Sequence, residues 1–93
     1  MIKSFKNKET ENVYQLEGSG KLPGDIQQVA LRKLRMINNA INLLDLRIPP
    51  ANKLEKLKGD RRGQHSIRIN DQWRICFTWR DGDAYEVGIT DYH

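Results

Sequence analysis

The hydrophobic periodicity of this 93-residue chain changes near Gly63, and this change limits the folds that it can adopt. Before Gly63 the apolar residues recur every three or four positions, which predicts amphipathic helices. After Gly63 they alternate with polar residues, which predicts half-buried strands. Helices followed by strands are typical of the α+β class, in which helices cover one face of an antiparallel sheet.

Two helices are predicted before Gly63. The first spans residues 7–16, with Asn7 as its cap and Val13 and Leu16 on its buried side. The second follows Pro23-Gly24-Asp25, where Asp25 and Gln28 form a variant of the capping box. Its apolar stripe consists of Ile26, Ala30, Leu34, Ile37, Ile41 and Leu44. Its other face carries Arg32, Lys33 and Arg35, which we expect to be solvated. Pro49-Pro50 ends the helical region.

The strands complete a β-α-α-β-β-β order, which we expect to form a single domain over residues 1–93. The opening Ile2-Lys3-Ser4-Phe5 predicts one strand, and three more follow Gly63. Turns are predicted at Asn70-Asp71 and at Arg80-Asp81-Gly82-Asp83. The residues expected to face the helices are His65, Ile67, Ile69, Trp73, Ile75, Phe77, Trp79, Tyr85, Val87 and Ile89.

The alternate residues of these strands share the opposite face, because side chains alternate along a strand. They are Ser66, Arg68, Arg74, Cys76, Glu86, Gly88, Thr90 and Tyr92. Arg74 lies in a central strand, where an arginine without a partner is costly. It is therefore either a ligand-binding group or the partner of Glu86. Guanidinium groups bind phosphate through paired hydrogen bonds, so Arg68 and Arg74 suit a phosphodiester.

Charged residues outside the strands also favour a nucleic-acid ligand. Lys and Arg number 16 against 12 Asp and Glu, which leaves a net charge of +4 and favours a polyanionic partner. Five basic residues precede the sheet and suit an RNA backbone: Lys53, Lys56, Lys58, Arg61 and Arg62. Glu55 lies among them and is either a solvated residue or a carboxylate base.

The chain ends in Asp91-Tyr92-His93, directly after the last predicted strand. Histidine is the side chain best suited to move protons near neutral pH, and Tyr92 can stack on a base or steady the ribose and phosphate. His65, by contrast, lies on the core-facing side and is expected to be structural.

Several classes of protein are disfavoured by what the sequence lacks. Cys76 is the single cysteine, and no Cys/His cluster has the spacing of metal ligands, so we expect no metal and no cofactor. No signal peptide or apolar run long enough to span a membrane is present. A cytoplasmic protein without membrane contact is the expectation.

Four segments together resemble the HigB branch of the RelE/ParE toxin superfamily. They are residues 54–61 (LEKLKGDR), 66–69 (SIRI), 73–75 (WRI) and 91–93 (DYH). The resemblance covers essentially the whole chain and implies the β-α-α-β-β-β fold. It also implies a toxin that cleaves messenger RNA in the A site of the 70S ribosome, without metal, by attack of the ribose 2′-hydroxyl on the adjacent phosphate. The implied partner is a HigA-type helix-turn-helix antitoxin, and the toxin is implied to bind operator DNA only within its complex with this antitoxin.

The resemblance also implies roles for individual residues. Lys58 and Arg74 would stabilise the scissile phosphate, Asp91 and Tyr92 would position the RNA, and His93 would donate or accept a proton. A family member has a histidine where Glu55 stands here, whereas other relatives pair a glutamate base with a histidine acid. The general base is therefore either Glu55 or His93.

Two other functions fit parts of the pattern. A ParE-like toxin shares the fold and inhibits DNA gyrase without cutting RNA, so the fold does not separate the two activities. A non-catalytic RNA-binding module would keep the basic surface but has no need of a terminal histidine. The residues Lys58, Arg74 and Asp91-Tyr92-His93 favour RNA cleavage.

Overall fold

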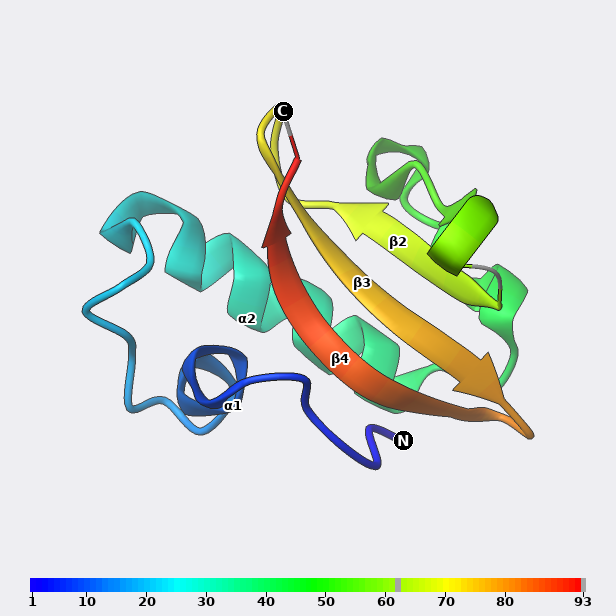
Figure 1. Ribbon diagram of the computed structural model, residues 1–93, viewed down its shortest axis with the longest axis horizontal. Helices are drawn as coiled ribbons and strands as arrows, with labels where there is room; N and C mark the ends of the chain where they lie inside the picture. Colours follow the sequence, from blue (N-terminus) through cyan, green and yellow to red (C-terminus); the bar gives the residue numbers. More distant parts are fainter. Residues whose placement is uncertain (62, 93) are drawn as a thin grey trace.

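The computed structural model describes residues 1–61 and 63–92, and it consists of one sheet with helices packed on one of its faces (Figure 1). Its helices are α1 (Lys8–Tyr14) and α2 (Gly24–Asn39), and its short 3-10 helices are η1 (Leu43–Arg47), η2 (Pro50–Asn52) and η3 (Gly59–Arg61). Its strands are β1 (Glu55–Lys56), β2 (Gln64–Arg68), β3 (Trp73–Arg80) and β4 (Asp83–Asp91). The strands pair antiparallel in the order β1-β2-β3-β4, so the predicted α+β class is confirmed.

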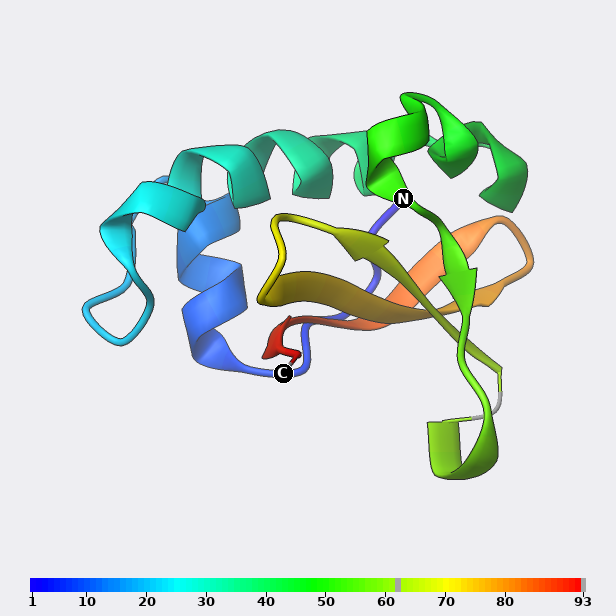
Figure 2. The same cartoon turned by 90° about the horizontal axis from the view of Figure 1, so that it is seen from above.

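The hydrophobic core lies between α2 and the sheet. Figure 2 shows α2 lying across one face, with α1 beside it and neither helix on the opposite face. The predicted core residues Leu34, Ile67, Ile75, Phe77 and Val87 are all fully buried. Each such side chain stabilises the fold by about 1.5–3 kcal/mol through removal of apolar surface from water. This burial determines which residues of each strand face away from the helices.

Both predicted turns form. At the tip of the β3–β4 hairpin, Asp81 and Gly82 have φ angles of 53° and 83°, the left-handed pair that a type I′ turn requires. At the β2–β3 connection, Asn70 Oδ1 accepts hydrogen bonds from the backbone N–H groups of Gln72 at 2.9 Å and Trp73 at 2.8 Å.

A β-bulge in β4 makes part of the predicted alternation wrong. Cys76 pairs with Gly88, but Thr78 pairs with Tyr85, so β4 has one extra residue between these pairs. Glu86 lies there with a φ of 52°. The extra residue moves Tyr85 to the face away from the helices and turns Ala84 into the core.

The bulge also explains why residues 2–5 do not form the predicted strand. They run parallel to β4 but make only two isolated bridges, Ile2 with Ala84 and Phe5 with Val87. These bridges lie on either side of Glu86, where the left-handed backbone interrupts the edge of β4. The fourth strand of the sheet is instead β1, which comes from the basic segment before Gly63, where we predicted no strand.

The helices differ from the prediction mainly at their ends. Asn7 caps α1 as predicted, since its Oδ1 accepts from the N–H of Thr10 at 2.9 Å. Leu16, however, lies beyond α1 and is exposed. The Asp25–Gln28 capping box does not form, because α2 already begins at Gly24.

The apolar stripe of α2 is shorter than predicted. Helix α2 ends at Asn39, and the carboxylate of Asp45 accepts the N–H groups of Ile41 and Asn42, at 3.0 Å each. These bonds turn the chain away from the axis of α2, so Ile41 and Leu44 are exposed rather than buried.

Lys33 was expected on the solvated face of α2 but is only 6% exposed. Its Nζ donates a short hydrogen bond to Oδ1 of the fully buried Asn52. Burial, followed by the nearby charges of Arg32 and Arg68, lowers the pKa of Lys33. The expected solvated position is therefore wrong, because a buried acceptor satisfies this ammonium group.

His65 lies half-buried on the core side of β2, as predicted, with its ring centroid 6.2 Å from that of Phe77. Its Nδ1 has no hydrogen-bond partner among the residues that the structure describes. Burial, and then the charge of Lys56, lowers the pKa of His65. The folded protein therefore favours the neutral imidazole.

This lowered pKa predicts a loss of stability in acid. Below the ordinary histidine pKa of about 6.5 the unfolded chain binds more protons than the folded chain, until the folded pKa is passed. The free energy of unfolding, measured with urea, should therefore fall between about pH 7.5 and pH 5, and His65→Gln should reduce that fall. An identical pH dependence in both proteins would contradict the assignment.

Candidate active site

Arg74 on β3 is the centre of the face that the helices leave uncovered. Its Nε donates to Ser66 Oγ at 2.8 Å, and its Nη2 donates to the backbone carbonyl of Lys53 at 2.7 Å. Its Nη1 lies 3.5 Å from a carboxylate oxygen of Glu55. The side chain of Arg74 is only 12% exposed, so its guanidinium group is fixed rather than free in solvent.

The register of the sheet brings these groups together. Ser66 pairs with Glu55 on β1 and with Cys76 on β3, while Arg68 pairs with Arg74. Glu55 and Ser66 therefore lie level with Cys76, two residues along β3 from Arg74, and on the same face of the sheet as Arg74. Glu86, the alternative partner of Arg74, lies at the bulge instead, and Glu55 forms the ion pair with Arg74.

This arrangement leaves hydrogen-bonding capacity for an anion. A guanidinium group carries five N–H donors, and among the described residues each terminal nitrogen of Arg74 has one partner for its two N–H bonds. One donor on each terminal nitrogen thus remains for a ligand oxygen. A fork held in place by other contacts binds a phosphate with little further ordering.

Of the three C-terminal residues, Tyr92 lies beside the Arg74 guanidinium. The ring centroid of Tyr92 is 5.7 Å from Arg74 Cζ, within the range of a cation–π contact. Asp91 ends β4 and accepts a hydrogen bond from Gln72 Nε2 at 3.2 Å. Together with Arg61 and Thr90, these residues line an open pocket of about 370 Å³. His93 lies outside the described residues.

The floor of the site is covered rather than open. Ser66 and Cys76 are small, but both are buried. Arg61 reaches over the floor from η3, with Nη1 3.6 Å from Cys76 Sγ. At the other side, a Cβ on Gly88 would lie only 3.0 Å from Lys6 Cβ. Polar and basic side chains, rather than helices, therefore cover this floor.

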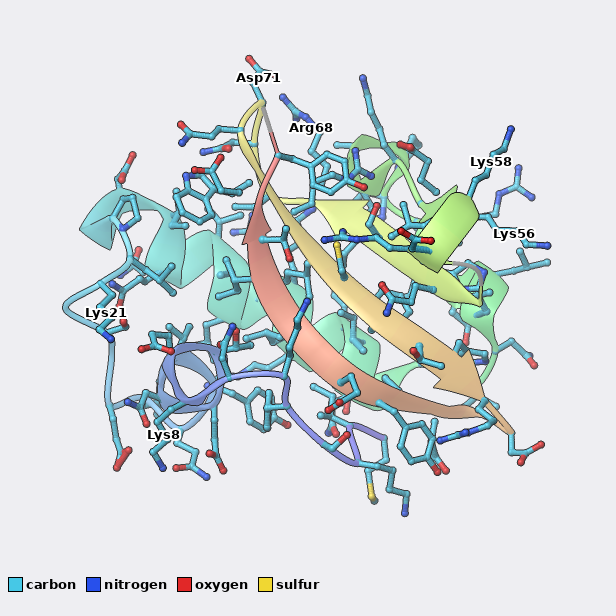
Figure 3. The ribbon with its side chains drawn as sticks, viewed as in Figure 1. Lys8, Lys21, Lys56, Lys58, Arg68 and Asp71 are labelled. Carbon is cyan, nitrogen blue, oxygen red and sulfur yellow. The ribbon has the colours of Figure 1, made fainter. Side chains whose placement is uncertain are left out.

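The side chains of the remaining basic candidates surround the site without joining it. Lys53, Lys56 and Lys58 are exposed, and Figure 3 shows the side chains of Lys56 and Lys58 pointing outward beside η3. Arg68 forms a short ion pair with Asp71 at the β2–β3 turn instead of joining Arg74. Arg62 lies outside the described residues.

The structure thus brings together Arg74, Glu55, Tyr92 and Arg61 from the predicted set. Two groups were missed: the hydroxyl of Ser66 and the carbonyl of Lys53. Strand alternation already placed Ser66 on the right face, whereas no sequence signal reports a backbone carbonyl. Among the described residues, no group of His, Cys, Asp and Glu could hold a metal, and no helix is long and apolar enough to cross a membrane.

Comparison with known proteins identifies the family. Residues 3–93 match the family model described as "RelE-like toxin of type II toxin-antitoxin system HigB". The chain belongs to this HigB family of toxins. It is therefore the toxin half of a toxin–antitoxin pair.

Two relatives of known name support this membership. The chain is 41% identical over 85 residues to Toxin HigB-1 of Vibrio cholerae, with 90% of each chain covered. It is 37% identical over 94 residues to Endoribonuclease HigB of Proteus vulgaris, with both chains covered in full.

Solved structures show the same fold. A YoeB–YefM toxin–antitoxin complex of Staphylococcus aureus matches with a TM-score of 0.61 and 19% identity, covering 100% of this chain and 98% of the other. The YafQ protein of Escherichia coli matches with a TM-score of 0.57 and 13% identity, covering 98% of this chain and 93% of the other.

The covered floor of this HigB-family toxin predicts slow reaction of its thiol. Cys76 is 5% exposed beneath Arg61, so a neutral alkylating reagent such as iodoacetamide should modify it slowly. Arg61→Ala should raise the rate several-fold by uncovering the sulfur, whereas Lys56→Ala removes the same charge from an exposed position and should not. Mass spectrometry measures the rate of alkylation of Cys76. Equal rates in all three proteins would show that Arg61 does not cover the floor.

Proposed function

We propose that this HigB-family toxin is a metal-independent endoribonuclease that cleaves messenger RNA in the A site of the 70S ribosome. The observation that carries the proposal is the Arg74 guanidinium, which is held by three protein groups on a basic face and retains donors for a phosphate. The name of the Proteus vulgaris relative, Endoribonuclease HigB, is in agreement.

The reaction is an in-line transesterification. The ribose 2′-oxygen attacks the adjacent phosphorus, the bond from phosphorus to the 5′-oxygen breaks, and the products are a 2′,3′-cyclic phosphate and a 5′-hydroxyl. Negative charge grows on the non-bridging oxygens in the transition state, where the fixed Arg74 stabilises it, together with Lys58 once that exposed side chain turns from solvent toward the bound RNA. Tyr92 and Asp91 position the nucleotide, with the Tyr92 ring available to stack on a base.

Two protons must move during this reaction. A base takes the proton of the 2′-hydroxyl, and an acid gives a proton to the leaving 5′-oxygen. The Glu55 carboxylate is 3.5 Å from Arg74 Nη1, so it lies beside the phosphate site as a base would. His93 follows Tyr92 directly and is the proposed acid, and the exchange of these two roles is the alternative.

The ribosome supplies what this small site lacks. Few catalytic groups are present, so much of the positioning of the messenger falls to the ribosome, and free RNA should be cut poorly. Lys53, Lys56, Arg61, Arg62 and Arg68 are proposed to contact RNA backbone around the site. The toxin then acts in the cytoplasm, where the ribosomes are.

The antitoxin is proposed to be a HigA-type helix-turn-helix protein. It would neutralise the toxin, and operator DNA would be bound only through the complex of the two. The toxin itself is proposed to fold as a single domain over residues 1–93.

Loss of Arg74 or of His93 should abolish messenger cleavage while the fold and antitoxin binding remain. Arg74→Ala removes a charge-stabilising donor, which typically costs about 10²- to 10³-fold in rate. Deletion of His93 removes a proton-transfer group, which typically costs about 10²- to 10⁴-fold. The measurement is mapping of messenger 5′ ends after brief expression. Arg80→Ala is the matched control, since it lies on the same strand but contacts Tyr85 away from the site.

Cuts in codon register that disappear in both variants and persist in Arg80→Ala are the expected result. Glu55→Gln separates the proton roles: a similarly large loss assigns the base to Glu55, and near-normal cleavage leaves that proton to His93 or to the ribosomal RNA. Intact messenger together with inhibited DNA gyrase in relaxation assays would contradict the proposal and favour a ParE-like toxin.

A further inference from the structure

We infer that Lys33 and Asn52 are positioning residues for Arg74, acting through the backbone carbonyl of Lys53. The inference rests on the proposed function, because it concerns the same phosphate-binding group. Neither residue touches the candidate site. Lys33 belongs to α2, on the far side of the sheet from that site, and Asn52 ends η2.

Asn52 is the centre of a buried polar cluster. Its side chain is fully buried, and its Oδ1 accepts the short hydrogen bond from Lys33 Nζ. Its Nδ2 donates to the carbonyl of Leu46 at 3.1 Å and to that of Ile48 at 3.3 Å. Both polar atoms of the amide are thus used, which is how a buried polar side chain is stabilised. The cluster ties η1 and η2 to α2.

The next residue carries the carbonyl that Arg74 uses. Lys53 has a left-handed backbone, with φ 45° and ψ 56°, and its N–H donates a hydrogen bond to the backbone carbonyl of Pro50 at 3.0 Å. A non-glycine residue adopts this conformation only where its surroundings impose it. Because the side chain of Lys53 is exposed, the buried Asn52 beside it is the anchor that directs the carbonyl at Arg74 Nη2.

The burial of Lys33 carries an energetic cost. The fold accepts a lysine that is 6% exposed, and its pKa is lowered by that burial. A buried ammonium group of this kind is unfavourable unless it has a partner. An apolar side chain at position 33 would fill the same space without that cost, but it would leave Asn52 Oδ1 unsatisfied and the turn at Lys53 less fixed. Lys33 is therefore suited to fixing the orientation of Asn52 and, through it, the turn at Lys53.

The first test observes Arg74 directly in the free protein by nitrogen-15 NMR of its guanidinium group. In the unaltered protein the signal of Nη2 should be resolved from that of Nη1, because the hydrogen bond to the Lys53 carbonyl hinders rotation of the guanidinium group about its Nε–Cζ bond. Lys33→Met and Asn52→Ala should broaden or merge the Nη signals, whereas the Nε–H signal should persist, since Ser66 holds it. A purely structural role would leave Nη2 unchanged or alter both signals together.

The second test measures cleavage on programmed ribosomes. Lys33→Met should lower kcat by about 10- to 10²-fold, as small misplacements of a catalytic group do, with little change in KM. Arg35→Met is the matched control, because it removes the same charge from an exposed position on the same helix. Ile37→Val controls for a loss of stability in the core of α2.

The outcomes distinguish the two claims. Unchanged Nη2 signals in a folded Lys33→Met protein would overturn the inference, as would a loss of kcat equal to that in Ile37→Val. Asn52→Ala acts through the same carbonyl, so Lys33→Met decides the matter if the alanine variant does not fold. Altered Nη2 signals in a protein that never cleaves messenger would support the positioning of Arg74 and contradict the proposed nuclease.

Discussion

The alternation of side chains along β2, β3 and β4 is the constraint on which this molecule depends. One small sheet must supply both the core and the candidate active site. Ile67, Ile75 and Phe77 are fully buried against the helices, while Ser66 and Arg74 occupy the alternate positions. A slip of one residue would exchange the two sets, so the hydrophobic energy of the core also fixes the position of the site.

Strands β2 and β3 alone do not complete the site. Two further partners of Arg74 come from the chain at the β1 edge of the sheet: the carboxylate of Glu55 on β1 and the carbonyl of Lys53, two residues before it. With Ser66 behind them, they orient the guanidinium before any ligand arrives. Such a preorganised charge stabilises a transition state without reorganisation during the reaction, and this is how a small toxin can act with few groups.

Sequence reasoning succeeded where burial leaves a periodic pattern and failed where it does not. The face that carries Arg74 followed from the apolar residues on either side of it. The bulge at Glu86 did not, because a single residue with positive φ leaves no mark in the alternation. Strand β1 is too short to show a period, and the carbonyl of Lys53 has no sequence signature. Lys33 was misplaced because charged residues are almost never fully buried.

The central claim is that the geometry of Arg74, and not only its charge, makes this face active. The most direct measurement is the rate of messenger cleavage on ribosomes by the Arg74→Lys protein. The planar fork of Arg74 contacts Ser66, Lys53 and Glu55 and still offers donors to a phosphate. Lysine keeps the positive charge but lacks this fork. The rate should be close to that of the Arg74→Ala protein. A rate close to that of the unaltered toxin would contradict the central claim.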